Sequence, residues 1–256
     1  MSHRDEYDTA MLAAMNLIWG EGFMAPGGVG HVEKLVAGLA LADQRLLDIG
    51  CGQGMPACLL AERHGARVVG TDLEHHLVRR SRSRAERLGV ADRATFLTVQ
   101  PGPLCFADGS FDVVISTGAF TQVEDKLGMF RECYRVLRPG GKLRCYDWMR
   151  SGDGYSDAMR RWLKLEGLTY AMETAAGQAA LLTEAGFGDV QVMDASAWYR
   201  AAVRREYEAL TGPLRQPLTA LLGADQAVHF IDNWRASCDV CERGEMRQVY
   251  MRACRP

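Results

Sequence analysis

The chain has 256 residues, enough for one α/β domain with insertions, or a domain with a lid, around a large core. Its formal net charge of −2 predicts no general attraction to nucleic acid or to anionic membranes. No apolar run approaches the roughly 20 residues of a membrane span, and the first residues do not resemble a signal peptide. The eight cysteines are scattered without a disulfide framework. We therefore expect a cytoplasmic protein with reduced thiols and with neither nucleic-acid nor membrane partners; no particular oligomeric state is predicted.

Residues 1–42 are predicted to form a helical cap that precedes the core. Apolar residues recur at helical spacing between Tyr7 and Trp19, as on one face of an amphipathic helix. The glycine-rich residues 20–28 interrupt this pattern, and a second helix is expected over 31–41. Core packing is the simpler interpretation of the large aromatic side chains here, and covering a bound ligand is the alternative.

The first strand leads into a glycine-rich turn. Residues 46–49 are three apolar residues and an acid, and Gly50, Gly52 and Gly54 follow at alternate positions. Glycine has no Cβ, so the backbone can turn sharply there and approach a ligand closely. Residues 55–61 then predict a helix, with proline tolerated in its first turn. A strand, a glycine turn and a helix N-terminus together predict a nucleotide-binding corner.

The spacing of this turn argues against a nicotinamide dinucleotide site. That fingerprint, G-x-G-x-x-G, requires a glycine at position 55, where the chain has Met55. The observed pattern is D-x-G-x-G-x-G, and its acid, Asp48, precedes the glycines.

Further strands are predicted at regular intervals along the first half of the chain. The second strand, residues 67–72, ends in Asp72, whose carboxylate can accept both hydroxyls of a ribose. The helix expected over 74–88 carries five arginines spread around its circumference, which favours a solvated face over a nucleic-acid patch. The remaining core strands are expected at 94–99, 111–116 and 142–147.

Between residues 46 and 143 the segments LDIGCGQG, VVGTDL, FADGSFDVVIS and ECYRVLRPGGKL resemble the class I S-adenosylmethionine (SAM) methyltransferases. The resemblance implies a Rossmann-like, seven-stranded sheet with helices on both faces. It also implies SAM as cofactor, S-adenosylhomocysteine as product and no metal. The positions that it assigns to cofactor binding are Trp19, Asp48, Gly50, Cys51, Gly52, Gly54, Asp72, Leu73, Gln100, Pro101, Ser116 and Thr117. Many relatives have an aspartate at the position of Gln100, and a glutamine carbonyl can equally accept from the adenine amino group.

The second half completes the core and adds an insertion. A helix is predicted over 175–185 and a sixth strand over 189–193, so the core spans residues 43–194. Residues 195–245 predict a lid of helices broken at Gly212-Pro213, Pro217 and Gly223, and 246–256 hold the final strand. Insertions of this length usually have a function. The pair Cys238 and Cys241 has no partner pair at zinc-binding spacing, so two thiols one helical turn apart is the favoured interpretation.

A closer resemblance links residues 19–28 and the final strand to phosphoethanolamine and related small-amine N-methyltransferases. It places the family's catalytic tyrosine on Tyr7, its partner histidine on Gln122 and a nearby aspartate on Gly118. It also matches Tyr170 to a substrate tyrosine of the family. Phe23 and Trp148 are further candidates for substrate contacts, because their rings could help to enclose an aminium by cation–π attraction. The basic residues that hold the phosphate in the family fall on Leu168 and near Ser237. The chain therefore lacks both the tyrosine–histidine pair and the phosphate clamp.

These departures favour methylation of a small-molecule amine. An amine with a free lone pair needs little base catalysis, whereas a hydroxyl needs a base, and Gln122 cannot accept a proton near neutrality. Aromatic side chains could attract an aminium by cation–π interaction. Two alternatives stay open: methylation of oxygen, sulfur or carbon with Asp147 or Glu124 as base, and a non-catalytic SAM-binding protein that regulates a partner.

Overall fold

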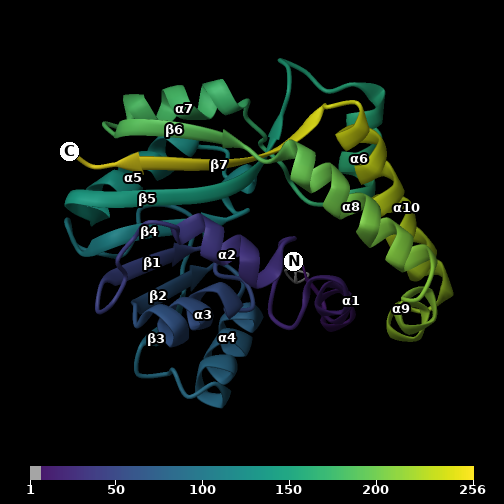
Figure 1. The fold of residues 1–256 in the computed structure, drawn as a ribbon, viewed down its shortest axis with the longest axis horizontal. Helices are drawn as coiled ribbons and strands as arrows, with labels where there is room; N and C mark the ends of the chain where they lie inside the picture. Colours follow the sequence, from purple (N-terminus) through teal and green to yellow (C-terminus); the bar gives the residue numbers. More distant parts are fainter. Residues whose placement is uncertain (1–6) are drawn as a thin grey trace.

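A seven-stranded sheet runs through the middle of the molecule, in the order β3-β2-β1-β4-β5-β7-β6 (Figure 1). The structure is a computed structural model, and it describes residues 7–256. The first five strands are parallel and β7 is antiparallel to both of its neighbours. The strands are β1 (Arg45–Ile49), β2 (Arg67–Asp72), β3 (Ala94–Thr98), β4 (Phe111–Thr117), β5 (Leu137–Arg150), β6 (Gly188–Asp194) and β7 (Met246–Cys254).

Helices cover both faces of this sheet, as the sequence predicts. The helices of one face are α2 (Gly28–Val36), α3 (Met55–His64) and α4 (His75–Arg87), and those of the other are α5 (Lys126–Val136) and α7 (Ala175–Glu184). Successive residues of β1 point to opposite faces, so that Leu46 packs in the first core and Leu47 in the second. Burial on both faces explains why the parallel strands are apolar at consecutive positions.

Two predicted boundaries are displaced. The second helix of the cap, expected over 31–41, runs from Gly28 to Val36. It ends early because Ala37 leaves the helical conformation and Gly38 has a φ of 82°. The strand expected over 142–147 begins at Leu137, because Leu137 already pairs with Phe111 and the register then shifts before Val113 pairs with Lys142.

The predicted lid consists of α8 (Ser196–Thr211), α9 (Arg215–Leu222) and α10 (Ala224–Glu242). The breaks at Gly212-Pro213 and Gly223 are confirmed, whereas the expected break at Pro217 is wrong. Pro217 lies in the first turn of α9, where a backbone N–H has no partner within the helix. None of the helices in residues 7–256 is both long and apolar enough to cross a membrane.

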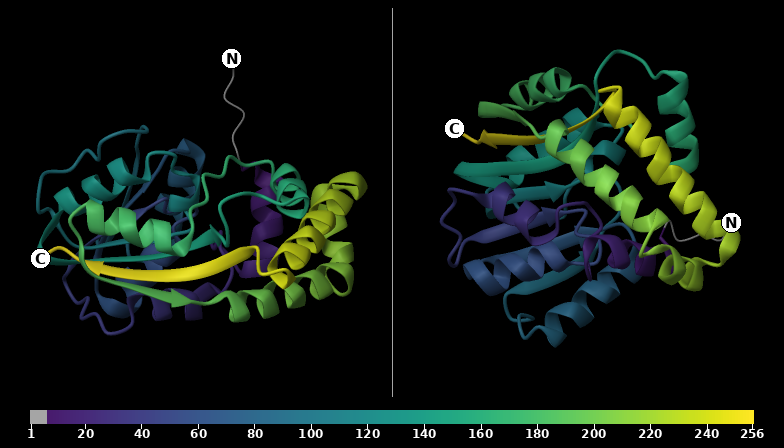
Figure 2. Two further views of the ribbon diagram at one scale, coloured as in Figure 1. Left: turned by 90° about the horizontal axis from the view of Figure 1, so that it is seen from above. Right: turned by 45° about the vertical axis from the view of Figure 1, so that its right-hand side comes forward.

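A helix that the sequence analysis missed joins the lid. It is α6 (Asp157–Glu166), which begins where the Ser156 hydroxyl accepts a hydrogen bond from the amide of Met159, at 3.1 Å. Helices α6 and α10 pack side by side, and α1 (Thr9–Trp19) lies between the lid and the sheet (Figure 2). A shared core of Ala14, Trp162, Tyr199 and Trp234 therefore unites the cap with the lid.

His31, a residue of α2, is buried against the sheet. Its Nδ1 lies 2.7 Å from the hydroxyl of Tyr250, and its ring centroid lies 3.5 Å from that of Tyr146. Burial, with a smaller contribution from Lys34, lowers the pKa of His31 from 6.5 to about 3. The folded protein therefore holds this imidazole neutral at pH values where the unfolded chain binds a proton.

This pKa predicts an acid-dependent loss of stability. Because the unfolded chain takes up the proton first, the contribution of His31 is complete above pH 6.5 and falls as the pH drops toward 3. Between pH 7.5 and 5 the loss is about 2 kcal/mol of unfolding free energy. Urea unfolding of the wild type and of His31→Gln should be measured at both pH values. Between them, the unfolding free energy of the variant should fall by about 2 kcal/mol less than that of the wild type. Equal losses in the two proteins would contradict the assignment.

Candidate active site

A cavity of about 980 Å³ opens at the carboxyl ends of the parallel strands, beneath the cap and the lid. Ligands of doubly wound sheets bind at this edge. One end of the cavity is formed by the glycine loop after β1, by the end of β2 and by the loop after β3. The other end is formed by side chains of α1, α6, α8 and α10. The cavity is large enough for a nucleoside cofactor together with a small acceptor.

The glycine loop can hold no larger side chains where it lines the cavity. Gly50 has a φ of 71°, and a Cβ there would lie 2.3 Å from the Cβ of Ala119. A Cβ on Gly52, whose φ is 53°, would lie 2.6 Å from the sulfur of Met24. The amide of Gly50 donates to the carbonyl of Thr71, at 2.8 Å, and so joins the loop to the end of β2. The loop therefore presents bare backbone to the cavity.

Asp72 is oriented by the backbone around it. One carboxylate oxygen accepts from the amide of Gly52 at 2.8 Å, and the other accepts from the amide of Glu74 at 3.0 Å. A carboxylate has about four lone-pair positions, so two more donors can be accepted. The next residue, Leu73, is 55% exposed and lines the same end of the cavity as an apolar wall. This end can therefore hold a ribose beside a flat base.

Asp48 lies beneath the glycine loop rather than in the cavity wall. Its side chain is fully buried, and neither carboxylate oxygen has a hydrogen-bond partner within the described residues. Burial, and to a smaller extent the charge of Asp72, raises the pKa of Asp48 to about 7. A buried carboxylate without a donor is costly, so this group destabilises the fold when it is charged.

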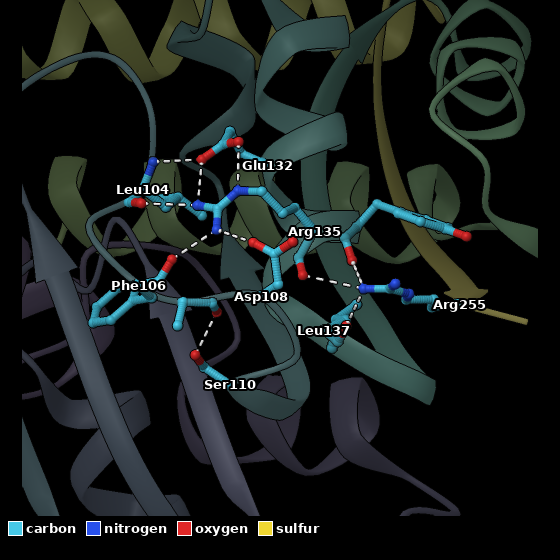
Figure 3. Close-up of polar contacts among 10 residues, drawn as sticks. Leu104, Phe106, Asp108, Ser110, Glu132, Arg135, Leu137 and Arg255 are labelled. Atoms are coloured by element: carbon cyan, nitrogen blue, oxygen red, sulfur yellow. Dashed lines mark hydrogen bonds and ion pairs between the residues drawn. The ribbon is translucent and has the colours of Figure 1, made fainter.

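The loop that carries Gln100 and Pro101 is held by one arginine of α5 (Figure 3). Arg135 donates to the carbonyls of Leu104 and Phe106, at 2.9 and 2.7 Å, and it pairs with Asp108 at 2.8 Å. Its other partner, Glu132, also accepts from the amide of Leu104, at 2.7 Å. Hydrogen bonds to these carboxylates raise the pKa of Arg135, which stays charged.

Replacing Arg135 with alanine should loosen this loop. The variant loses several charge-assisted hydrogen bonds, so we expect its unfolding free energy to fall by about 2 kcal/mol and its affinity for S-adenosylhomocysteine to fall several-fold. Arg131→Ala is the matched control, because Arg131 lies on the same helix and its pair with Glu184 is exposed. Denaturant unfolding and calorimetry would test this, and equal behaviour of the two variants would contradict it.

Arg84 of α4 is buried and connects two parts of the site. The arginines of α4 were interpreted as a solvated face, but Arg84 is only 4% exposed. It donates to the carbonyl of Gln53 in the glycine loop, and it pairs with Glu21 of the cap at 3.3 Å. Burial lowers the pKa of Arg84. Arg84 thus ties the cap to the glycine loop, which the even spread of arginines in the sequence did not indicate.

Most of the residues that the resemblance assigned to the site are brought together around the cavity. Those that line it are Tyr7, Trp19, Gly50, Gly52, Asp72, Leu73, Gln100, Pro101, Thr117, Gln122, Trp148 and Tyr170. Those that do not are Asp48, Cys51, Gly54, Ser116 and Phe23. Cys51 and Phe23 are buried in the core beneath α2 and α3, and Gly54 caps α3. The assignment of Phe23 to substrate binding is therefore not supported by its position.

The catalytic positions of the resemblance also meet in the cavity. Gln122 lies in the short helix η1 (Phe120–Gln122), and Tyr7 lies just before α1. The Trp148 ring fills the space beside Gly118, where a Cβ would lie 2.6 Å from it. Asp147, by contrast, is 1% exposed and does not line the cavity, whereas Glu124 does. Of the two carboxylates considered as a base, only Glu124 lines the cavity.

Two carboxylates of the lid end were not predicted. They are Glu166, at the end of α6, and Glu206, on α8. Glu206 lies on the same helical face as the buried Val203 and Leu210, and an acid on an apolar face is the signal that could have revealed it. Within residues 7–256, no lysine, arginine or histidine lines the cavity. That part of the chain also holds no group of three or more His, Cys, Asp or Glu side chains that could bind a metal.

A sequence family described as a methyltransferase domain matches residues 47–145, which include the glycine loop and Asp72. These residues form a methyltransferase domain. Phosphoethanolamine N-methyltransferase 1 of Arabidopsis thaliana is 25% identical over 94% of this chain and 48% of its own. The 27-O-demethylrifamycin SV methyltransferase of Amycolatopsis mediterranei is 32% identical over 69% of this chain and 66% of its own.

The fold of the methyltransferase domain and its additions is also known from solved structures. A phosphoethanolamine N-methyltransferase 2 of Haemonchus contortus, solved with phosphomonomethylethanolamine and S-adenosylhomocysteine, superposes with a TM-score of 0.89 at 22% identity. The match covers 97% of this chain and 58% of that one. The chain spans about half the length of the curated phosphoethanolamine relatives it matches. The class I methyltransferase fold and the resemblance inferred from the sequence are therefore confirmed.

Proposed function

We propose that the protein is a SAM-dependent methyltransferase that methylates a small-molecule amine and releases S-adenosylhomocysteine. The observation that carries the proposal is the single cavity that joins the glycine loop and Asp72 to an aromatic, lid-covered end. A methyl acceptor in that end lies next to a cofactor held by the loop. An in-line displacement mainly requires that the acceptor is oriented and that water is excluded, and a covered end of the cavity can meet both requirements.

The chain's residues fit the cofactor in several places. Asp72 has lone pairs left for the ribose hydroxyls, Leu73 and Pro101 offer apolar surface, and Gln100 offers an acceptor for an amino group. When bound, SAM supplies an electrophilic methyl group on a sulfonium. The relatives and neighbours named above support this cofactor, since one of them is solved with S-adenosylhomocysteine.

An amine acceptor agrees best with the side chains near the reacting end. Within the described chain no histidine or lysine lines the cavity, and Gln122 can orient an N–H but cannot take its proton. A neutral amine attacks with its own lone pair, and its proton can leave after transfer. A hydroxyl acceptor is the second candidate, favoured by the position of Glu124 and by the relative named as a rifamycin methyltransferase.

The test is incubation of the protein with SAM and a panel of small amines, phenols and thiols, followed by mass spectrometry. Methylated amines together with S-adenosylhomocysteine are expected. Methylation confined to phenols or thiols would overturn the amine assignment. Tight SAM binding without any methylated product would favour the non-catalytic regulator instead.

A further inference from the structure

The acceptor end of the cavity combines aromatic walls with two carboxylates. Its aromatic side chains come from the cap, β5, α6, the loop after it and the lid, and they are Trp19, Trp148, Trp162, Tyr170, Tyr199 and Trp234. Aromatic faces attract cations, most strongly where water is excluded. Because no basic side chain of residues 7–256 lines the cavity, nothing described there would neutralise an anionic acceptor.

Glu206 is held between the cap and the lid by uncharged donors. One carboxylate oxygen accepts from the indole nitrogen of Trp19 and the other from that of Trp234, each at 3.0 Å. These two hydrogen bonds leave further lone pairs of the carboxylate available. Burial raises the pKa of Glu206, because the two indoles and the nearby Arg205 compensate only part of the lost hydration.

Glu166 is arranged in the same way on the neighbouring helix. It accepts from the hydroxyl of Tyr170 at 3.1 Å and from the side-chain amide of Asn233. Neither Glu166 nor Glu206 forms an ion pair with a basic side chain of the described residues. Arg205 and His229 lie near enough to Glu206 and Glu166 to act on them through charge, but neither carboxylate forms an ion pair with them. Two half-buried carboxylates without an ion-paired cation, enclosed by aromatic rings, are complementary to a positively charged ligand.

We propose that Glu166 and Glu206 bind an ammonium group of the methyl acceptor, which is therefore an amine with a second cationic nitrogen. This inference rests on the proposed function and deepens it. A nitrogen that accepts a methyl group must be unprotonated when it attacks, so a nitrogen held as ammonium by a carboxylate is not the reacting one. The acceptor class is thus a diamine, and amines that carry a phosphate or carboxylate are excluded.

The experiment compares four probes of equal chain length: α,ω-diaminobutane, butylamine, butanol and aminobutyrate. Their binding to the complex with S-adenosylhomocysteine is measured by calorimetry, and their methylation with SAM is measured by mass spectrometry. The diamine and butylamine both carry an ammonium near neutral pH, so both should bind roughly ten- to a hundredfold more tightly than butanol. Only the diamine should be methylated, because the single nitrogen of butylamine is held protonated, and aminobutyrate should bind more weakly than butylamine. Equal binding of butylamine and butanol, equal methylation of butylamine and the diamine, or preferred binding of aminobutyrate would overturn the inference.

Variants assign the effect to the two carboxylates. Glu206→Gln and Glu166→Gln should each weaken the binding of the diamine and of butylamine roughly tenfold or more and leave that of butanol nearly unchanged. Affinity for S-adenosylhomocysteine should stay at the wild-type level, which also shows that the variants fold. Glu208→Gln, on the exposed side of α8, is the control and should change nothing. Failure of the wild type to bind S-adenosylhomocysteine would contradict the proposed function itself, whereas unchanged diamine binding in both variants contradicts only this inference.

Discussion

Replacing Asp72 with alanine should weaken SAM binding roughly ten- to a hundredfold, the equivalent of about 1–3 kcal/mol. The substitution removes the proposed acceptor of the ribose hydroxyls. It also leaves the amides of Gly52 and Glu74 without the carboxylate that accepts from them, at 2.8 and 3.0 Å. The glycine loop then loses one of its contacts with β2. The lost ribose contact and the loosened loop both lower the affinity for SAM.

Calorimetry with SAM and with S-adenosylhomocysteine measures this effect. Asp72→Asn separates charge from shape, because it keeps one oxygen acceptor but places an amide N–H where donors already point. We expect the SAM affinity of Asp72→Asn to lie between that of the wild type and that of Asp72→Ala. Asp92→Ala, at an exposed position before β3, is the control. Wild-type affinity in Asp72→Ala would refute the placement of the cofactor.

The nucleotide end of the site follows from the sequence because it is made of local signals. A strand of three apolar residues and an acid, three alternate glycines and a helix start all lie within residues 46–61, and Asp72 ends the next strand. Parallel neighbours in one sheet bring these ends together whatever the surroundings are, and β1 does pair with β2. Here the structure departs from the assignment only at Asp48, Cys51, Gly54 and Ser116, which do not line the cavity.

The acceptor end could not be derived in the same way. It is assembled from the cap, α6 and the lid, which are far apart in the chain and meet only through packing. Trp19 and Trp234 share Glu206 across this boundary, with indole-to-carboxylate distances of 3.0 Å, and no local pattern encodes such a contact. Helix α6 was missed because its start depends on one serine cap within an otherwise irregular connection.

The same non-local packing decides whether Asp147 or Glu124 could act as a base toward the acceptor. Asp147 was expected at the end of its strand, but β5 continues to Arg150. Asp147 is buried, and its carboxylate accepts from the amide of Trp148, at 3.1 Å. Burial raises its pKa to about 7, and Lys126 opposes this shift only in part. A titration of Asp147 therefore reports on the core rather than on the reacting acceptor, and loss of activity in Asp147→Asn would not be evidence for methylation of oxygen.

The role of Gln122 gives the last expected result. If the acceptor is an amine, turnover should rise with pH up to the pKa of the amine itself, with no inflection from an enzyme histidine near pH 6.5. Gln122→His supplies such a group and should add an inflection there. Tyr7, which also lines the cavity, can offer the acceptor a hydrogen bond, so Tyr7→Phe should lower the rate roughly ten- to a hundredfold without changing the profile. Tyr207→Phe, on α8 but outside the cavity wall, is the control. A wild-type profile that follows an enzyme group whatever amine is used, together with an inactive Glu124→Gln, would show instead that a carboxylate base removes a proton from the acceptor.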